Sequence, residues 1–143
     1  MGKKKPKAPV NQMTLNLCRK NGWMIGRTEY KVRWNITKDL FGFIDFVAIR
    51  PDEKGVLALQ VTTFGNRLDR LRKITGQTSD EATAWLKAGN QIEVWGWKRA
   101  TATSKQRGWA LKRDCVILDS ENKLECVDIP LDMEGKRNGN QNQ

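Results

Sequence analysis

Four polar side chains lie in or beside two apolar runs of the sequence, and their types suit metal binding. Asp45 interrupts the first run, residues 43–50, Gln60 and Thr62 interrupt the second, and Asp39 comes before both. A carboxylate in a buried strand is strongly destabilising unless it is paired or binds a metal ion. Carboxylate and amide oxygens are the ligands that Mg²⁺ and Mn²⁺ prefer. These residues are therefore candidates for metal-dependent chemistry, although backbone amides or a structural hydrogen bond could equally satisfy each of them.

The two runs are predicted to be neighbouring strands. Each is short and rich in Val, Ile, Leu or Phe, and the turn-forming segment Pro51–Gly55 separates the first from the second, residues 56–62. Both are almost continuously apolar, so we expect both faces to be covered, as in the middle of a mixed α/β sheet. Side chains alternate along a strand, which places Gln60 and Thr62 on one face. A hairpin would bring Asp45 beside them.

The remaining sequence predicts the elements around this pair. We expect a helix over 11–20, a loosely alternating strand within 23–34, the two central strands, helices over 66–75 and 78–88, and strands over 91–97, 109–118 and 124–129. The order α-β-β-β-α-α-β-β is typical of an α/β or α+β domain with a mixed sheet flanked by helices. We assign residues 1–10 to a disordered basic segment, 11–130 to one domain and 131–143 to a disordered polar tail.

Local signals suggest where the helices begin, end and face. Asn11 is a candidate N-cap of the first helix and Gly22 its stop. The segment Thr78–Glu81 has the spacing of a capping box. Leu68, together with Leu71 and Ile74, forms an apolar stripe on the middle helix, whose other positions are largely basic.

Charge and residue usage narrow the function classes. The net charge is +10, which favours a polyanionic partner, DNA more than RNA. Three cysteines without short spacing and the absence of histidine exclude the usual zinc sites and Ser-His-Asp catalysis. There is neither a long apolar run nor an apolar segment after the basic start, so we expect a cytoplasmic, non-secreted protein without membrane attachment.

Basic residues cluster in two places that could contact a phosphate backbone, and a solvated surface is the alternative for each. The predicted nucleic-acid-binding residues are Arg67, Arg70, Lys73, Lys98, Arg99, Lys105, Arg107 and Lys112, with Arg113 beside the last of them. Trp95 and Trp97 share a strand face and are expected in the core, with one of them partly exposed as an alternative.

An Asp on one strand followed by acid-x-Lys on the next is the pattern of the PD-(D/E)xK nuclease superfamily, which includes restriction-endonuclease-like and Holliday-junction-resolvase-like enzymes. The chain resembles this superfamily over roughly residues 11–97, and the family core order α-β-β-β-α-β matches the predicted elements. By this resemblance Asp45 stands at the metal-binding Asp, Gln60 at the second acid and Thr62 at the lysine.

The resemblance implies a Mg²⁺- or Mn²⁺-dependent endonuclease acting on DNA, including branched or nicked DNA, and a homodimer if both strands are cut. Asp45, Asp39 and Gln60 would be the metal ligands, with Thr62 orienting the water. Glu29 is a further candidate carboxylate.

The sequence departs from the family pattern, because Gln60 lacks the charge of the second acid and Thr62 cannot supply a cation. Either the site is rebuilt, with Asp39 as the added carboxylate and Lys38 or Arg67 as the cation, or catalysis is lost. In the second case the chain would be a non-catalytic nucleic-acid-binding protein. A basic structural or assembly protein is the third alternative.

Overall fold

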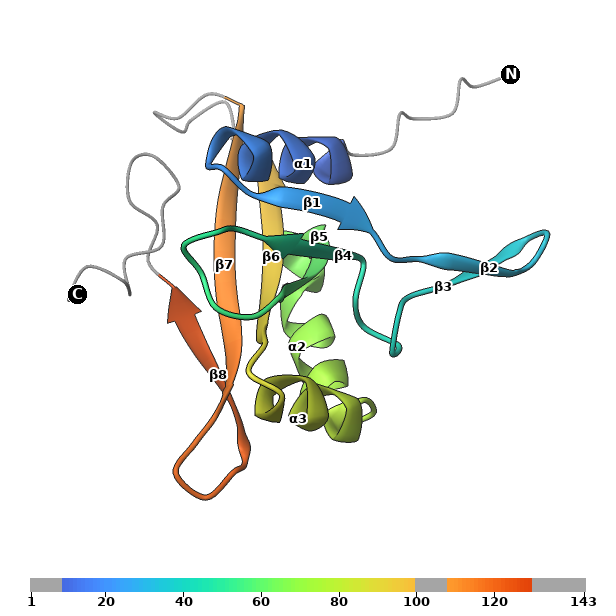
Figure 1. Cartoon of the computed structure of the whole chain (residues 1–143). Coiled ribbons are helices and arrows are strands. Elements are labelled where there is room, and N and C mark those ends of the chain that lie inside the picture. The colour runs from blue at the N-terminus through green and yellow to red at the C-terminus, as the bar shows by residue number, and fades with distance from the viewer. Residues whose placement is uncertain (1–8, 100–107, 130–143) are drawn as a thin grey trace.

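The computed structural model describes residues 9–99 and 108–129. Within them the chain forms an α/β structure whose elements are shown in Figure 1. They are α1 (Val10–Lys20), β1 (Met24–Arg27), β2 (Tyr30–Arg33), β3 (Ile36–Lys38), β4 (Phe46–Ile49), β5 (Leu57–Thr63), the 3₁₀ turn η1 (Phe64–Asn66), α2 (Arg67–Thr75), α3 (Ser79–Lys87), β6 (Gln91–Arg99), β7 (Trp109–Leu118) and β8 (Leu124–Ile129). The predicted fold class, a mixed sheet flanked by helices, is confirmed.

The main sheet has six strands in the order β1-β4-β5-β6-β7-β8. The strands β1, β4 and β5 form an antiparallel meander. The helices α2 and α3 then carry the chain across to β6, which runs parallel to β5, and β7 and β8 continue antiparallel. The predicted central hairpin is confirmed, since Phe46 of β4 pairs with Leu59 of β5.

Helices cover both faces of this sheet. One face packs α1 against Leu57, Leu59 and Val61 of β5. The opposite face packs α2 and α3 against Ala58 of the same strand. Because side chains alternate along a strand, Gln60 and Thr62 belong to the face with α2 and α3, where both are buried. The expectation of a strand covered on both faces is therefore correct for β5.

Polar contacts fix α1 to the sheet. The Trp97 indole donates a hydrogen bond of 3.0 Å to the Thr14 hydroxyl, which itself donates to the Val10 carbonyl. Trp95 and Trp97 pack edge to face, with ring centroids 6.4 Å apart, and both are buried. The alternative that one of these two indoles is exposed is therefore wrong.

A fully buried ion pair lies on the α1 face of β6 and β7. Glu93 and Arg113 are 0% and 1% exposed, and Glu93 Oε1 accepts hydrogen bonds from Arg113 Nε and from the Trp95 indole, each of 2.9 Å. The guanidinium also lies 5.3 Å from the centroid of the Trp95 ring. Arg113 cannot contact a phosphate backbone from this position, so its assignment to the basic surface was wrong.

Burial and the neighbouring Glu93 carboxylate raise the pKa of the Cys18 thiol to about 12. Its thiol is therefore protonated near neutral pH, as expected for a structural, unreactive cysteine.

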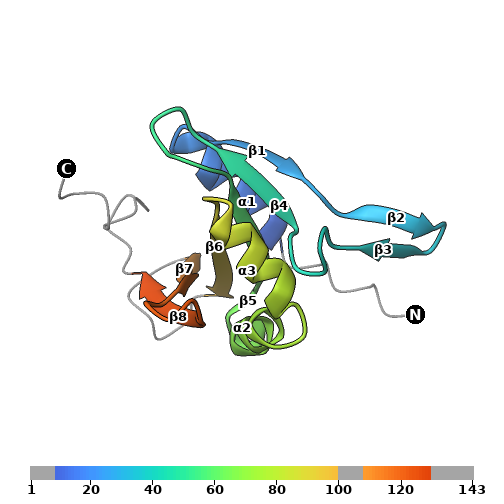
Figure 2. The same ribbon diagram turned by 60° about the horizontal axis from the view of Figure 1, so that its bottom comes forward.

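The segment predicted as one strand within 23–34 is two. β1 joins the main sheet, whereas β2 pairs with β3 in a separate two-stranded hairpin, the β2–β3 hairpin (residues 30–38). Figures 1 and 2 show this hairpin extending away from the sheet. Every residue of β2 and β3 is exposed, so the burial pattern that normally reveals a strand is absent here.

Several predicted helix details were also wrong. Pro9, and not Asn11, occupies the N-cap of α1, whereas Gly22 follows its end with a φ of 84° as expected for a stop. The Thr78 hydroxyl donates to the Lys73 carbonyl instead of capping α3. Leu68 is 50% exposed, because the core contact of α2 is made by the other two residues of the predicted stripe.

No helix among the described residues is long and apolar enough to cross a membrane.

Candidate functional site

A tight turn brings Asp39 back to Asp45. The expected strand over 43–50 is shorter, and Asp45 comes immediately before β4. Leu40 and Ile44 form an isolated bridge, and between them Phe41 and Gly42 have φ values of 53° and 83°. A positive φ is unfavourable for Phe, and such strain is typically found near functional sites.

Asp45 is held by the neighbouring strand β5. Its Oδ2 accepts a hydrogen bond of 2.8 Å from Gln60 Nε2 and one of 2.9 Å from the backbone N–H of Val61. The backbone N–H of Asp45 donates to the carbonyl oxygen of Leu59. The predicted contact between Asp45 and Gln60 is confirmed, and Thr62 lies buried two residues further along the same face.

Burial raises the pKa of the Asp45 carboxyl to about 7. A hydrogen bond with the Asp39 side chain and the negative charges of Asp39 and Glu29 contribute to this rise after burial, and the Val61 N–H opposes it. Three acidic groups thus act on one another here. Their mutual repulsion favours either a bound proton or a bound cation.

Without metal ions, the Asp45→Asn substitution should make stability less dependent on pH. The native carboxyl has a pKa of about 7 against an ordinary 3.8, so between these values the folded chain holds more protons than the unfolded chain. The contribution of the Asp45 carboxyl to wild-type stability should therefore be greatest below pH ~4 and fall by on the order of 3 kcal/mol as the pH rises to ~7. The Asn variant lacks this fall. Urea unfolding in EDTA measures the difference, and parallel pH curves for the two proteins would contradict it.

The amide of Gln60 is only half satisfied. Its Oε1 atom is buried and has no hydrogen-bond partner among the described residues. An unpaired buried acceptor destabilises a protein by about 1–3 kcal/mol. Rotation about the terminal side-chain torsion, which is broad and roughly two-fold, would exchange the two amide atoms and present the oxygen to Asp45.

The oxygens of Asp45, Asp39 and Gln60 fit a hard divalent cation in chemical type. Among the described residues no group of three or more His, Cys, Asp or Glu side chains is arranged to hold a metal ion. Mg²⁺, however, commonly takes one or two carboxylates and keeps several waters. Two carboxylates and one amide oxygen are therefore sufficient for such an ion, although they offer less charge than three carboxylates would.

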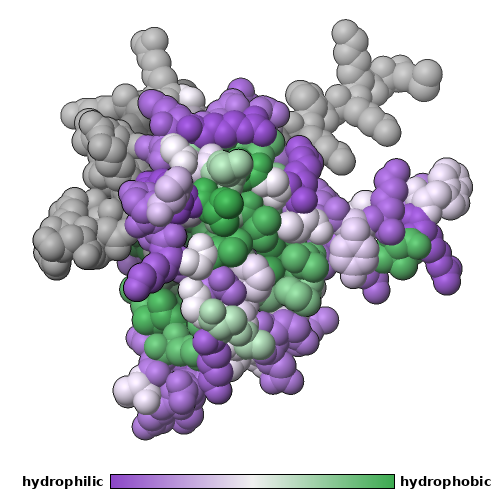
Figure 3. Space-filling view, viewed as in Figure 1, coloured by the Kyte–Doolittle hydropathy of each residue, from purple (hydrophilic) through white to green (hydrophobic). Residues whose placement is uncertain are grey.

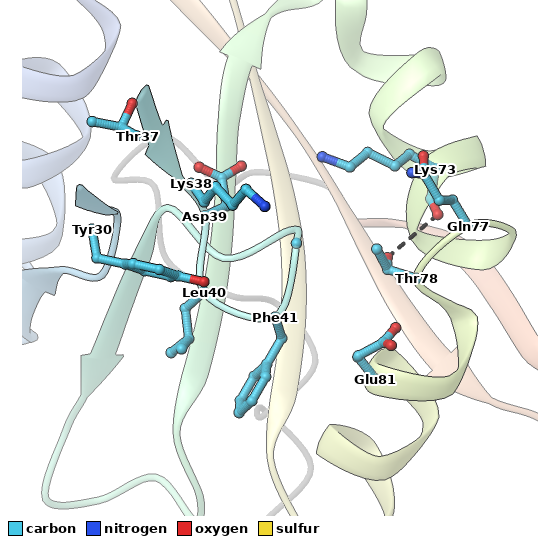
Figure 4. Close-up of a pocket in the computed structure, with 11 residues that line it drawn as sticks. Tyr30, Thr37, Lys38, Asp39, Leu40, Phe41, Lys73, Gln77, Thr78 and Glu81 are labelled. Atoms are coloured by element: carbon cyan, nitrogen blue, oxygen red, sulfur yellow. Dashed lines mark hydrogen bonds between the residues drawn. The ribbon is translucent and has the colours of Figure 1, made fainter. Parts of the chain in front are cut away.

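A groove of about 810 Å³ lies beside the turn that carries Asp39. The β2–β3 hairpin forms one wall with Tyr30 and Lys38, and α2 contributes Lys73 to the other. Figure 4 shows the ammonium groups of Lys38 and Lys73 extending toward one another from the two walls. Neither lysine forms an ion pair with another described residue. The groove therefore presents these two unpaired cations together with the carboxylates of Asp39 and Glu81.

Two other predicted nucleic-acid-binding cations form ion pairs with acidic residues of the protein itself. Arg67 Nε lies 2.8 Å from Asp114 Oδ2, over Gly96, which has no side chain to obstruct it. Lys112 pairs with Asp114 and with Asp128. Arg67 is therefore unsuited to be the cation of the rebuilt site that the sequence suggested, because an acidic partner already neutralises it.

The remaining predicted cations fall into three groups. Arg70 lies beside Lys73 in a smaller pocket of about 380 Å³ on α2. Lys98 and Arg99 are exposed at the end of β6, and Lys98 Nζ lies 5.2 Å from the Phe64 ring centroid. Lys105 and Arg107 lie outside the described residues, as do residues 1–8 of the predicted basic segment 1–10 and the whole of the predicted tail 131–143, whereas Val10 already belongs to α1.

Hydrogen bonds connect the hairpin to the acidic turn. The Thr28 hydroxyl donates to the Ile44 carbonyl at 2.7 Å, and the Thr28 N–H donates to the Asp45 carbonyl at 3.0 Å. At the other root, β3 ends at Lys38, next to Asp39. Both roots of the hairpin are therefore attached to the segment that carries the two carboxylates.

Sequence reasoning missed Asp114, Glu93 and Trp34. Glu93 interrupts a run of apolar residues in a predicted strand, which is the same signal that identified Asp45, whereas Asp114 follows two basic residues and gave no such signal. Trp34 gave no signal, because only the structure shows that its side chain is 85% exposed.

Comparison with protein-family models, with curated proteins and with solved structures finds no match. Function is therefore inferred from the geometry of the site.

Proposed function

We propose that the chain is a metal-dependent nuclease that hydrolyses DNA phosphodiester bonds. The observation that carries the proposal is the contact between Asp45 and Gln60 on neighbouring strands, with Asp39 held beside them. The meander β1-β4-β5 followed by a helical crossover to the parallel strand β6 is also the order expected from the resemblance to the PD-(D/E)xK superfamily.

The proposed division of roles follows the position of each side chain. Asp45 and Asp39 would hold Mg²⁺ or Mn²⁺, with the Gln60 carbonyl oxygen as a third ligand. When bound, such an ion lowers the pKa of its water and neutralises charge on the phosphate oxygens. Lys38 is exposed at the groove beside Asp39 and would supply the positive charge that Thr62 cannot. Arg70 and Lys73 would hold the phosphate backbone.

One observation favours a second candidate, a non-catalytic nucleic-acid-binding protein. In the structure the amide nitrogen of Gln60, and not its oxygen, faces Asp45. A hydrogen bond from this nitrogen already satisfies the carboxylate, as expected for a structural pair.

Incubation with DNA separates the two candidates. Supercoiled, single-stranded and four-way-junction DNA would be incubated with the protein and Mg²⁺ or Mn²⁺, with EDTA as the control. Metal-dependent cleavage of any substrate supports the nuclease. Salt-sensitive binding without cleavage would favour the binding protein, and absence of binding at low salt would exclude both.

The double variant Arg70→Gln/Lys73→Gln should bind duplex DNA more weakly and with a shallower salt dependence. Removing one cation that binds a phosphate reduces the slope of log K against log salt by about 1. Fluorescence anisotropy at several salt concentrations measures this slope. The control Arg72→Gln/Lys87→Gln removes the same charge from exposed positions outside the groove. Equal slopes for the two double variants would show that binding depends on net charge and not on the positions of Arg70 and Lys73.

A further inference from the structure

The β2–β3 hairpin carries an unusual surface for a soluble protein. Trp34, at its tip, is 85% exposed, and the strands beside it expose Tyr30, Val32 and Ile36 to about half. Figure 3 shows hydrophobic and hydrophilic side chains next to one another on this projection. Large exposed apolar surfaces on soluble proteins usually mark interaction sites.

The charge on the hairpin indicates the kind of partner. Residues 30–38 include the three cations Lys31, Arg33 and Lys38 and no acidic residue. An exposed aromatic ring among cations is the composition with which proteins bind single-stranded nucleic acid, where cations contact phosphates and rings stack on bases. A second copy of the chain fits less well, because the partner surface would belong to a molecule with a net charge of +10.

The shape of the hairpin also suits this partner. It is a two-stranded ribbon with exposed residues on both faces, and its register shifts between Lys31 and Arg33. Its base, at Tyr30 and Lys38, lines the groove next to Asp39. Nucleic acid in that groove would therefore meet the hairpin.

We propose that Trp34 is a stacking site for an unpaired base of the nucleic acid that lies in the groove. This inference rests on the proposed function, and it deepens it by naming a feature of the substrate. The hairpin would select nucleic acid that carries unpaired nucleotides next to the scissile phosphate, such as a gap or a single-stranded extension.

The length of the hairpin sets where the unpaired base should lie. Trp34 precedes Asp39 by five residues, so at about 3.3 Å per strand residue its backbone is at most roughly 16 Å away. At about 3.4 Å per nucleotide, this span corresponds to no more than about 5 nucleotides from the site. A duplex whose gap begins within about 5 nucleotides of the phosphate at the acidic pair should be bound best.

The test compares Trp34→Ala, Trp34→Phe and the control Val32→Ala, which truncates another exposed apolar side chain of the hairpin. Anisotropy would measure the affinity for a labelled single strand, a blunt duplex and a duplex with a gap. Trp34→Ala should weaken binding to the single strand and the gapped duplex by roughly tenfold or more and change blunt-duplex binding by less than about twofold. Trp34→Phe should retain most of the affinity, and Val32→Ala should behave as wild type.

The readout is binding in EDTA, so it distinguishes this inference from the nuclease proposal. Wild type that binds single strands through Trp34 but cleaves nothing would support the inference and reject the nuclease. Equal weakening on all three DNAs, or none on any, would overturn the stacking site. A loss of dimer by light scattering in Trp34→Ala, with unchanged DNA affinity, would instead assign the hairpin to self-association. Because Trp34 lies outside the core, an unchanged melting temperature is expected for each variant.

Discussion

The Asp45→Asn variant of the proposed nuclease should lose DNA cleavage by roughly a thousandfold or more, because removing a proposed metal ligand would remove several kcal/mol of transition-state stabilisation. Asparagine keeps an acceptor for the Val61 N–H, and a rotated Gln60 amide can still pair with it, so the fold is preserved. DNA affinity should change little, since it depends on lysine and arginine. Initial cleavage rates with saturating Mg²⁺, together with anisotropy, measure the two effects.

Asp52→Asn is the matched control, because it removes one carboxylate from an exposed position in the loop before β5. The Asp45→Asn protein is also expected to be more stable than wild type above pH ~7, because the raised pKa of the Asp45 carboxyl in the wild-type protein implies a cost of ionising it there. A protein that gains stability and loses cleavage cannot have been inactivated by unfolding. If the Asp45→Asn protein cleaved DNA at the wild-type rate, Asp45 would not be an active-site residue.

Breaking the buried pair of Glu93 and Arg113 should have the largest effect on stability. Arg113→Met leaves the Glu93 carboxylate without its cation in a fully buried position, which typically destabilises a protein by about 3–5 kcal/mol. Glu93→Leu leaves the guanidinium in the same situation. The double variant should recover most of the loss, because apolar side chains of similar size fill the same space. Urea unfolding of the four proteins gives the coupling between the two residues.

If the two single changes were each nearly neutral, the pair would be better solvated than its burial indicates. If the double variant were the sum of the single ones, the two charges would act independently. Neither variant should affect DNA binding directly, since the pair lies on the α1 face and the groove lies beside the turn that carries Asp39. Strong loss of DNA affinity in a folded Arg113→Met protein would show that Arg113 contacts DNA after all.

The central part of the structure could be predicted because several local signals agree there. Short apolar runs separated by Pro51–Gly55 indicate a hairpin, and the alternation of side chains places Gln60 toward one face. The carboxylate in the first run indicates where chemistry could occur. These signals depend only on backbone geometry and burial, which sequence patterns record well.

Other features could not be predicted because they depend on contacts between distant residues. Whether Arg67 faces solvent or Asp114 is decided by the packing of α2 on β6, where Gly96 leaves room for the arginine. The sequence around Arg113 is basic and does not show that pairing of β6 with β7 places this arginine beside Glu93. Apolar and polar residues alternate over residues 30–37, which predicts strand structure, but the β2–β3 hairpin has no buried face, so this alternation does not reveal that the segment leaves the main sheet.

The β2–β3 hairpin is attached at both ends to the turn that carries the two carboxylates. Thr28 holds one root to Ile44 and Asp45, and the other root continues directly into Asp39. The turn between Asp39 and Asp45 is therefore bonded to one end of the hairpin and continuous with the other. The same few hydrogen bonds therefore fix both the base of the hairpin and the spacing of the two acids.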